Sequence, residues 1–358
     1  YEARRIKISE RRFSNIKRCF RLEARIYFPF YARRDDRKLD EKTVRDLLNK
    51  KILVTGGTGM LGQAFENTHE GYEIVKVGTS KWDLTRYDDA IDMFETIRPA
   101  VCIHLAARVG GVKANTDNMA DFCTDNLSIN TNVLRAANQM DVTKVLSLLS
   151  TCIYPDNASY PLTEDQIHAG PPHISNFGYA YAKRMLDVQS RAYRQQYGNN
   201  FITAVPNNLF GPNDNYDLNN SHVIPAIMRK MHEAKINNKN VVLWGDGTPL
   251  REFTYSKDLA DILLFLLEHY DEQEPINVGN TKEYSIKEVA EMIAEITGFT
   301  GEIVWDISKP SGQYRKPSDG SKLVELGWEQ KNYKDLRKSL TETYKWVILK
   351  YPNLRGVA

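Results

Sequence analysis

Residues 51–65 read KILVTGGTGMLGQAF, the segment that is most informative about the fold. Its first five residues form a short apolar run that favours a buried strand, and the glycines that follow predict a tight turn opening into a helix. Strand-like and helical segments then alternate: we expect strands at 72–77, 100–106, 144–150 and 201–206, and helices at 87–97, 120–140 and 179–197. Such alternation with short connections predicts an α/β protein with a doubly wound parallel sheet.

The second half of the chain is less regular. Residues 207–225 are rich in Asn, Gly, Pro and Asp, which predicts a long ordered loop. Further on, Ser285 and Glu288 have the spacing of a capping box, and Gly298 is placed to end the same helix. A last helix places five residues on one face: Leu336, Leu340, Tyr344, Val347 and Tyr351. We expect this half to supply a smaller α/β lid over the carboxyl edge of the sheet, where ligands bind in such folds.

The composition excludes several classes of protein. With 42% hydrophobic and 26% charged residues, the 358-residue chain has the balance of a globular protein. It contains no apolar run long enough to cross a bilayer, and its first residues do not have the pattern expected of a signal peptide. The four cysteines, Cys19, Cys102, Cys123 and Cys152, show neither a zinc spacing nor a disulfide framework. We therefore expect no metal site, no membrane or nucleic-acid partner, and a reducing, cytoplasmic setting.

The net charge of +2 hides an asymmetry. Residues 1–50 contain 16 Lys and Arg against 8 Asp and Glu, whereas the other 308 residues contain 32 against 38. A basic arm that touches an anionic surface is one interpretation of residues 1–50, and a solvated extension outside the catalytic fold is the one we favour. We expect a chain that starts near Leu48 to fold and to keep its activity.

The glycine turn predicts a dinucleotide site. Gly56, Gly59 and Gly62 stand between a strand and a helix, where a backbone without side chains can approach a pyrophosphate. The second strand ends at Gly78 rather than at the acid that typically binds the ribose hydroxyls of NAD, and Lys81 follows. This favours NADP, although Lys81 is also compatible with an ordinary solvated lysine.

A second pattern predicts acid–base chemistry. Tyr179 and Lys183 are four residues apart on a predicted helix and share one face, and Ser150 ends a predicted strand at the carboxyl edge of the sheet. The ordinary pKa of tyrosine is about 10, and we expect the Lys183 ammonium to lower the pKa of Tyr179 toward neutrality. The serine hydroxyl could hold a substrate carbonyl.

Together these patterns resemble the extended short-chain dehydrogenase/reductase family. Five further segments resemble one branch of it, the GDP-L-fucose synthase family: HLAARVGGV at 104–112, STCIYP at 150–155, NLFGP at 208–212, NSHVIPA at 220–226 and LWGDGTPLREF at 243–253. The resemblance covers about residues 51–350 in the family's order. It implies a Rossmann fold, NADP(H) as cofactor, and conversion of GDP-4-keto-6-deoxy-D-mannose by 3,5-epimerisation and then reduction at C4.

The resemblance also implies a role for individual residues. Ser150, Tyr179 and Lys183 would be the reductase triad, and Cys152 and His222 the pair that exchanges protons on opposite faces of the sugar. The implied cofactor-binding residues are Gly56, Gly57, Thr58, Gly59, Met60, Leu61, Gly62, Lys81, Leu148, Lys183, Pro206, Asn208, Leu209 and His222. The implied substrate-binding residues are Asn208, Lys230, Trp244 and Arg251.

The sequence departs from the family pattern at two positions. Asn207 replaces the family's usual threonine, and Ser311, in the segment Lys309–Gly312, stands where the family commonly has aspartate. The second departure puts a sugar or guanine contact at that segment in doubt. The resemblance further implies a homodimer formed through the helices at 120–140 and 179–197.

These observations divide the chain into predicted domains. Residues 1–50 would be the extension, residues 51–206 the NADP-binding Rossmann domain with returning elements near 253–280, and residues 207–252 with 281–358 the substrate-binding domain.

Two other functions remain open at this point. A sugar dehydratase or simple epimerase of the same superfamily is one, but dehydratases of this type carry a carboxylate directly after the Ser or Thr of the triad, and here Cys152 follows Thr151. A non-catalytic NADP-binding regulator is the other, and the complete set of candidate catalytic side chains argues against it.

Overall fold

The computed structural model describes residues 51–69, 72–309 and 314–357. The basic segment 1–50, together with the predictions made for it, lies outside the described residues, as does Ser311. Among the described helices, none combines the length and the apolar character that a bilayer crossing requires.

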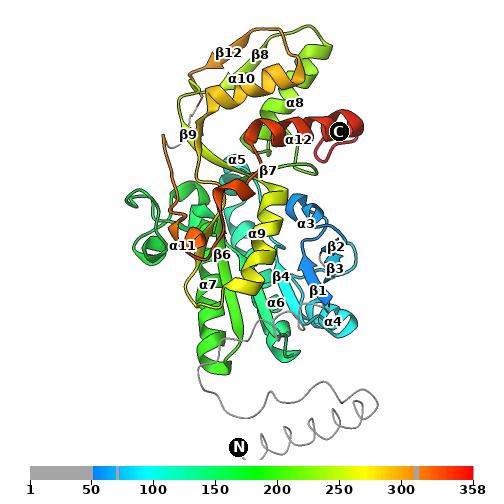
Figure 1. The fold of residues 1–358 in the computed structure, drawn as a ribbon, viewed down its shortest axis with the longest axis vertical. Helices are drawn as coiled ribbons and strands as arrows, with labels where there is room; N and C mark the ends of the chain where they lie inside the picture. The colour runs from blue at the N-terminus through cyan, green and yellow to red at the C-terminus, as the bar shows by residue number, and fades with distance from the viewer. Residues whose placement is uncertain (1–50, 70–71, 310–313, 358) are drawn as a thin grey trace, which may run out of the picture. The chain divides into compact units, whose positions relative to one another are not determined.

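A seven-stranded sheet forms the centre of the first region, in the order β10-β6-β5-β4-β1-β3-β2 (Figure 1). The strands are β1 (Lys51–Thr55), β2 (Thr68–His69), β3 (Tyr72–Val77), β4 (Val101–His104), β5 (Lys144–Leu148), β6 (Asn200–Pro206) and β10 (Ile276–Val278). All neighbours run parallel except β2, which is antiparallel to β3. The predicted doubly wound parallel sheet is confirmed.

Helices cover both faces of this sheet because its strands are apolar on both faces. Ile52 and Val54 pack into one hydrophobic cluster with α3 (Met60–Ala64), α9 (Ser256–His269) and α11 (Ser321–Glu325). Leu53, between them in the strand, packs into the opposite cluster with α4 (Tyr87–Ile97), α6 (Met119–Gln139) and α7 (Phe177–Tyr197). The period-two alternation of a strand thus supplies two cores from one short sequence.

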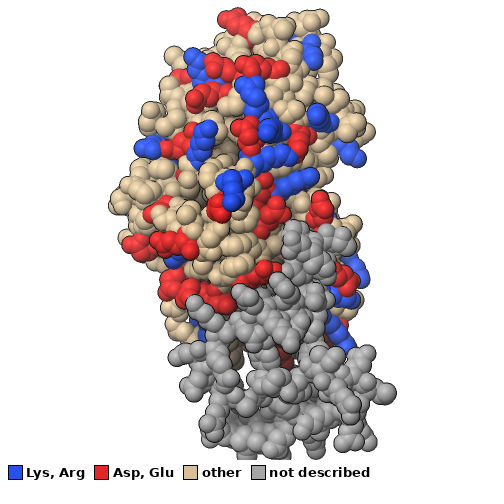
Figure 2. All heavy atoms as spheres, viewed as in Figure 1, with Lys and Arg blue, Asp and Glu red and all other residues tan. Residues whose placement is uncertain are grey.

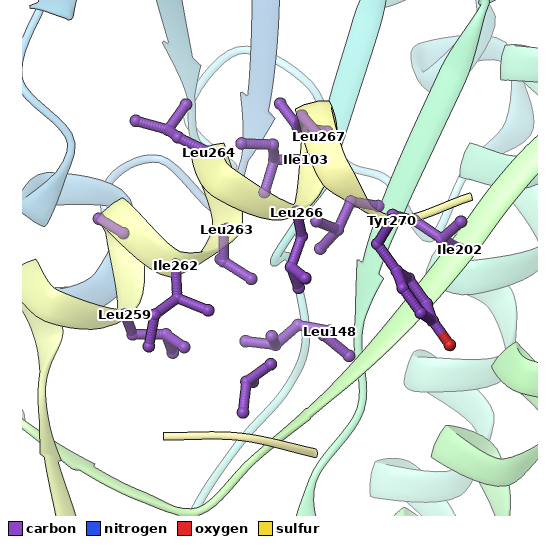
Figure 3. Packing of buried hydrophobic residues seen from close by; sticks show 14 of the residues in the cluster. Ile103, Leu148, Ile202, Leu259, Ile262, Leu263, Leu264, Leu266, Leu267 and Tyr270 are labelled. Carbon is purple, nitrogen blue, oxygen red and sulfur yellow. The ribbon is translucent and has the colours of Figure 1, made fainter. Parts of the chain in front are cut away.

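Helix α9 shows how the chain returns to the sheet after the lid begins. Its leucines and Ile262 lie against side chains of β4, β5 and β6, such as Ile103, Leu148 and Ile202 (Figure 3). Lys144 at the start of β5 closes its last turn, because the buried ammonium donates to the carbonyls of Leu266, Leu267 and Tyr270 at 3.3, 2.8 and 2.7 Å.

The second region is built on two small sheets. One has the order β11-β9-β7, from Glu283–Ser285, Leu250–Tyr255 and Asn208–Phe210, and the other pairs β12 (Ile303–Asp306) with β8 (Val241–Trp244). Their third hydrophobic cluster includes residues of α8 (Val223–Ile236), α10 (Ile286–Thr297) and α12 (Leu336–Lys350). The predicted capping box of Ser285 and Glu288 is present, and α10 ends at Gly298 in the left-handed conformation.

One part of the chain packs differently from the proposed domain division. Leu323 and Trp328 lie within 281–358, yet both are buried in the cluster under β10 and α9 of the large sheet. The domain boundaries stay a prediction. The predicted division assigned Leu323 and Trp328 to the substrate-binding domain, whereas their side chains pack in the core of the large sheet.

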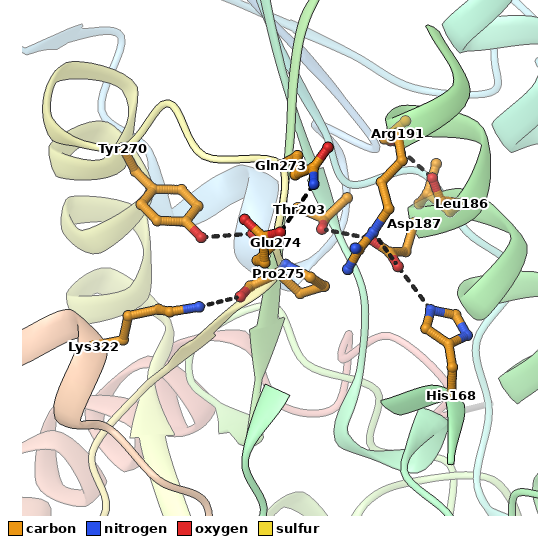
Figure 4. A network of polar contacts seen from close by, with 11 residues as sticks. His168, Leu186, Asp187, Arg191, Thr203, Tyr270, Gln273, Glu274, Pro275 and Lys322 are labelled. Atoms are coloured by element: carbon orange, nitrogen blue, oxygen red, sulfur yellow. Dashed lines mark hydrogen bonds and ion pairs between the residues drawn. The ribbon is translucent and has the colours of Figure 1, made fainter. Parts of the chain in front are cut away.

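A buried polar network fixes α7 against β6 (Figure 4). The fully buried Asp187 carboxylate accepts hydrogen bonds from Arg191 at 3.1 Å and from Thr203 at 3.3 Å, and lies 2.8 Å from His168. Because α7 also carries Tyr179 and Lys183, this anchor holds the candidate catalytic helix in one register relative to the sheet.

On the face shown in Figure 2, the described residues carry basic and acidic side chains interspersed with one another.

Candidate active site

The glycine turn is packed too tightly for side chains at three of its positions. A Cβ at Gly57 would lie 2.6 Å from the Val77 nitrogen, and one at Gly62 would lie 2.5 Å from the Gly56 oxygen. Gly56 has a φ of +69°, which favours glycine. The Gly59 N–H donates to the Gly56 carbonyl at 3.0 Å, and this closes the turn.

The outer edge of the turn is open. Thr58 is exposed and Gly59 and Met60 are half-exposed, whereas Leu61 and Gly62 are buried against the sheet. A backbone that is bare of side chains and lies at the carboxyl end of β1 fits a dinucleotide pyrophosphate, so the residues present agree with the predicted cofactor.

Gly78 directly follows β3, and the packing there leaves no room for a side chain. A Cβ at Gly78 would lie 2.5 and 2.7 Å from the side-chain atoms of Thr58, so an acid could not occupy this position without displacing Thr58. Lys81 is exposed, and its ammonium lies 4.0 Å from the centre of the Trp82 ring. An exposed lysine near the turn is compatible with a 2′-phosphate, and its role stays a prediction.

Ser150 and Cys152 form the centre of the site. β5 ends at Leu148, and the chain then enters a short 3-10 helix at Thr151–Ile153 that Ser150 caps. The Cys152 thiol donates to Ser150 Oγ over 3.0 Å. Burial raises the pKa of the Cys152 thiol, while the hydrogen bond to Ser150 and the charges of Lys316 and Lys183 oppose this rise.

Tyr179 and Lys183 reach the same place from α7. The Lys183 ammonium is buried, donates to the Leu148 carbonyl at 2.7 Å and lies 5.9 Å from the centre of the Tyr179 ring. A hydrogen bond between Tyr179 and Ser150 favours the phenolate, but burial outweighs it and raises the pKa of Tyr179.

The expectation that Lys183 lowers the pKa of Tyr179 toward neutrality is therefore wrong for this structure. The physical reason is that both groups are buried, and desolvation disfavours their charged forms. Burial lowers the pKa of Lys183 itself to about 8, although the charge of Cys152 favours its ammonium. Near neutral pH the Tyr179 hydroxyl is therefore protonated.

His222 is the residue directly before α8. Its side chain is exposed and does not cap the helix. The loop before it is held to residues 110–112, since Gly111 N–H donates to the Asn220 carbonyl at 3.3 Å.

The four predicted substrate residues come from the second region. Lys230 donates to the carbonyl of Val242 at 2.9 Å. Val242 lies in β8 two residues before Trp244, whose side chain is 60% exposed. Arg251 donates to the Leu250 carbonyl at 2.7 Å, and burial lowers its pKa. Asn208 donates to the Glu252 carbonyl at 2.9 Å, which ties β7 to β9.

The remaining predicted positions lie at the ends of the sheet strands. Pro206 is the last residue of β6, and Leu209 follows in β7. Between them Asn207 is buried, where its amide donates to Glu252 and accepts from Thr254 at 2.6 Å. The departure from threonine at this position therefore serves a buried polar network.

The structure adds Lys316, which the sequence analysis missed. Burial lowers the pKa of this lysine, while the charge of Cys152 opposes the change and Arg251 acts in the same direction as burial. Lys316 is therefore within electrostatic reach of both Cys152 and Arg251. The residues next to Lys316 in the sequence form no motif that could have identified it. Lys316 comes close to Cys152 and Arg251 only when the lid is folded.

The chain is similar to known proteins. The family model described as "NAD dependent epimerase/dehydratase family" matches residues 52–279. The chain is 41% identical to GDP-L-fucose synthase of Dictyostelium discoideum, covering 86% of this chain and 98% of the relative. It is 45% identical to a probable GDP-L-fucose synthase 1 of Oryza sativa subsp. japonica, covering 83% and 92%.

A solved structure agrees with the fold. A GDP-L-fucose synthetase from Naegleria fowleri bound to NADP superposes with a TM-score of 0.81 at 39% identity, covering 86% of this chain and 95% of that one. The chain belongs to the NAD dependent epimerase/dehydratase family and, within it, to the GDP-L-fucose synthase family.

Proposed function

We propose that this protein makes GDP-L-fucose from GDP-4-keto-6-deoxy-D-mannose, by epimerisation at C3 and C5 followed by reduction at C4. The observation that carries the proposal is the cluster of Ser150, Cys152, Tyr179 and Lys183, with Cys152 Sγ 3.0 Å from Ser150 Oγ. A dehydratase would need a carboxylate where Cys152 stands, and a regulator would need none of these groups.

Epimerisation requires a base and an acid on opposite faces of the sugar. The Cys152 thiolate would take the proton from the carbon beside the C4 carbonyl, and the resulting enolate would be held by the hydroxyls of Ser150 and Tyr179. His222 would return a proton to the opposite face of the same carbon. The positive charges of Lys183 and Lys316 favour the thiolate that starts this step.

Reduction then uses the acid on α7. NADPH, when bound, supplies the hydride that adds to C4. The Tyr179 hydroxyl would give its proton to the C4 oxygen, and its raised pKa keeps that proton in place until the oxygen becomes basic. Lys183, fixed on the Leu148 carbonyl, would hold the nicotinamide ribose.

The cofactor would lie along the carboxyl edge of the large sheet. The predicted set begins with the turn residues Gly56, Gly57, Thr58, Gly59, Met60, Leu61 and Gly62 and continues with Lys81, Leu148, Lys183, Pro206, Asn208, Leu209 and His222. The bare turn would take the pyrophosphate, and Lys81 would favour a 2′-phosphate, so NADPH rather than NADH is the expected donor.

The GDP moiety would bind between the catalytic cluster and the lid. Arg251 and Lys316 supply two positive charges for the diphosphate, and the exposed ring of Trp244 offers a flat surface for the nucleotide. Lys230 and Asn208 complete the predicted substrate contacts. We also propose a homodimer and a cytoplasmic location.

One experiment tests the function. The protein is incubated with GDP-4-keto-6-deoxy-D-mannose and either NADPH or NADH, and the product is identified by chromatography and nuclear magnetic resonance. We expect GDP-L-fucose, with a higher kcat/KM for NADPH. Formation of a GDP-6-deoxyhexose with unchanged C3 and C5 would contradict the epimerase half of the proposal, and a preference for NADH would contradict the cofactor half.

A further inference from the structure

The loop between β7 and α8, residues 211–222, contains buried polar atoms without a partner. Asp214 Oδ2, the Tyr216 hydroxyl and Ser221 Oγ are buried, and none of them has a hydrogen-bond partner among the described residues. Asp214 is only 5% exposed and Tyr216 is fully buried. Because burying an unpaired polar group costs free energy, three in one twelve-residue loop call for a functional reason.

Asp214 is held in a fixed orientation. Its other oxygen, Oδ1, accepts the backbone N–H of Asn215 at 2.7 Å. The carboxylate therefore has one oxygen committed to the loop and one, Oδ2, available.

The loop around Asp214 is fastened at both sides of Tyr216. The Tyr216 N–H donates to the Arg355 carbonyl at 2.8 Å, and the Tyr216 carbonyl accepts from Arg229 of α8 at 2.8 Å. The Tyr216 ring stacks on Trp346 of α12, with centroids 6.2 Å apart and planes at 24°. Such a rigid support is what a residue with a positioning role needs.

His222 ends this loop, and its exposed side chain makes no capping hydrogen bond to α8. The charges that act on the buried Asp214 come from His222 of the same loop and from Arg355 of the C-terminal segment, and both favour its carboxylate. Burial raises the pKa of the neighbouring Tyr216 hydroxyl, and the charge of Asp214 raises it further. The unpaired carboxylate oxygen of Asp214 and the His222 imidazole thus lie within electrostatic reach of each other.

We propose that Asp214 is the positioning residue for His222: its Oδ2 accepts one ring N–H of His222 and directs the other toward the sugar. This inference rests on the proposed epimerisation. In each inversion the Cys152 thiolate takes the proton from the sugar carbon, and the His222 imidazolium gives its proton to the opposite face. The thiol and the neutral imidazole that remain are reset by exchange with water, and Asp214 stays an ionised carboxylate throughout.

The hydrogen bond from His222 to Asp214 Oδ2 forms when substrate is bound, since hydrogen bonds of catalytic groups commonly shorten in the bound complex. A carboxylate that accepts from one ring nitrogen selects which nitrogen faces the sugar.

The burial of the Asp214 carboxylate lowers the stability of the fold, and this effect distinguishes a functional role of Asp214 from a structural one. Burial raises the pKa of Asp214 to about 6, above its unfolded value of 3.8. A raised pKa means that the folded protein binds the proton more tightly, so the carboxylate destabilises the fold above about pH 6. The cost disappears as the pH falls from about 6 toward 4. Asp214→Asn should therefore leave the melting temperature at pH 7.5 unchanged or higher.

The experiment measures deuterium incorporation at C3 and C5 of GDP-4-keto-6-deoxy-D-mannose in deuterated water, by mass spectrometry, at several pH values. We expect D214N to slow the incorporation by about 10- to 100-fold, since a positioned acid contributes about 10²- to 10⁴-fold in total. The matched control is Asp217→Asn. Asp217 belongs to the same loop and accepts from Asn219 and Asn220 at 3.0 and 2.6 Å, and D217N should keep the rate within about twofold of wild type.

Combining D214N with H222N tests whether Asp214 affects deuterium incorporation through His222. If Asp214 acts through His222, D214N should add less than about twofold to the loss caused by His222→Asn, because coupled residues are non-additive. Wild-type incorporation in D214N, or an equal loss in the H222N background, would overturn the proposal. A fall in the melting temperature of D214N would also count against it. Failure of the wild-type protein to exchange at all would instead overturn the proposed function.

Discussion

At the residue scale, burial controls the charges of the candidate catalytic groups. Desolvation alone disfavours both the Cys152 thiolate and the Lys183 ammonium, yet each is favoured by the charge of the other. The two charged forms are therefore expected to appear together, and Lys316 adds a second positive charge near the thiolate. This explains how a buried thiol could serve as a base without being permanently ionised.

The first residue-scale prediction concerns Cys152→Ser. A serine hydroxyl is far too weak a base at neutral pH, so deuterium incorporation at C3 and C5 should fall by more than about 100-fold. Hydride transfer needs Tyr179 and Lys183 rather than the thiol, so slow NADPH oxidation should continue and yield a GDP-6-deoxyhexose that is not epimerised. Mass spectrometry measures the deuterium incorporation, and absorbance measures the oxidation of NADPH. Exchange at the wild-type rate would make Cys152 a packing residue.

The converse variant is Tyr179→Phe. It removes the proton donor to the C4 oxygen, so NADPH oxidation should fall by about 10²-fold or more. Exchange should survive better, because the enolate keeps the Ser150 hydroxyl as a partner. Equal losses of both activities would mean that Tyr179 contributes to the two reactions in the same way, against the division of roles proposed here.

At the element scale, the glycine turn between β1 and α3 tolerates a side chain less well at Gly62 than at Gly59. A Cβ at Gly62 would lie 2.5 Å from both the Gly56 oxygen and the Gly57 Cα, which are backbone atoms that cannot move aside cheaply. A Cβ at Gly59 would have only the Gly56 oxygen nearby, at 3.3 Å. The two positions share the motif but differ in how closely the backbone packs.

The corresponding prediction compares two substitutions. Gly62→Ala should lower the free energy of unfolding by roughly 1–3 kcal/mol and weaken NADPH binding, because overpacking displaces the turn. Gly59→Ala should cost less than about 1 kcal/mol. Chemical denaturation and fluorescence titration with NADPH measure the two effects. An equal loss of stability in both variants would show that the Gly62 position relaxes at low cost.

Elements that follow from local pattern were predictable from the sequence, and those that follow from tertiary contact were not. The helix at 87–97 and the capping box at Ser285 depend on periodicity and spacing, and the structure has both. The burial of Trp328 under the large sheet and the approach of Lys316 to Cys152 depend on where the lid folds back. For the same reason the sequence predicted the wrong direction for the pKa of Tyr179, since spacing reveals a nearby lysine but not the desolvation of both groups.

At the scale of the whole molecule, α7 is buried on one side and bare on the other. It packs on α6 and β6, but Phe177, Met185 and Val188 on its outer side are 42%, 40% and 41% exposed. Their spacing of eight and three residues places them on one face of the helix. An apolar face of this kind supports the proposed homodimer, in which the same helix of a second copy would cover it.

The last prediction tests that arrangement with Met185→Asp. A carboxylate at the centre of an apolar contact would have to be desolvated without a partner, so the dimer should dissociate to monomers at micromolar concentration. The matched control is Leu349→Asp on α12, since Leu349 is 82% exposed and lies far along the chain from α7. Light scattering coupled to size-exclusion chromatography should give a monomer for M185D and a dimer for L349D and the wild type. A monomeric wild type would refute the homodimer itself, whereas a dimeric M185D would place its interface elsewhere. Because the catalytic groups proposed here come from a single chain, monomeric M185D should also retain deuterium exchange.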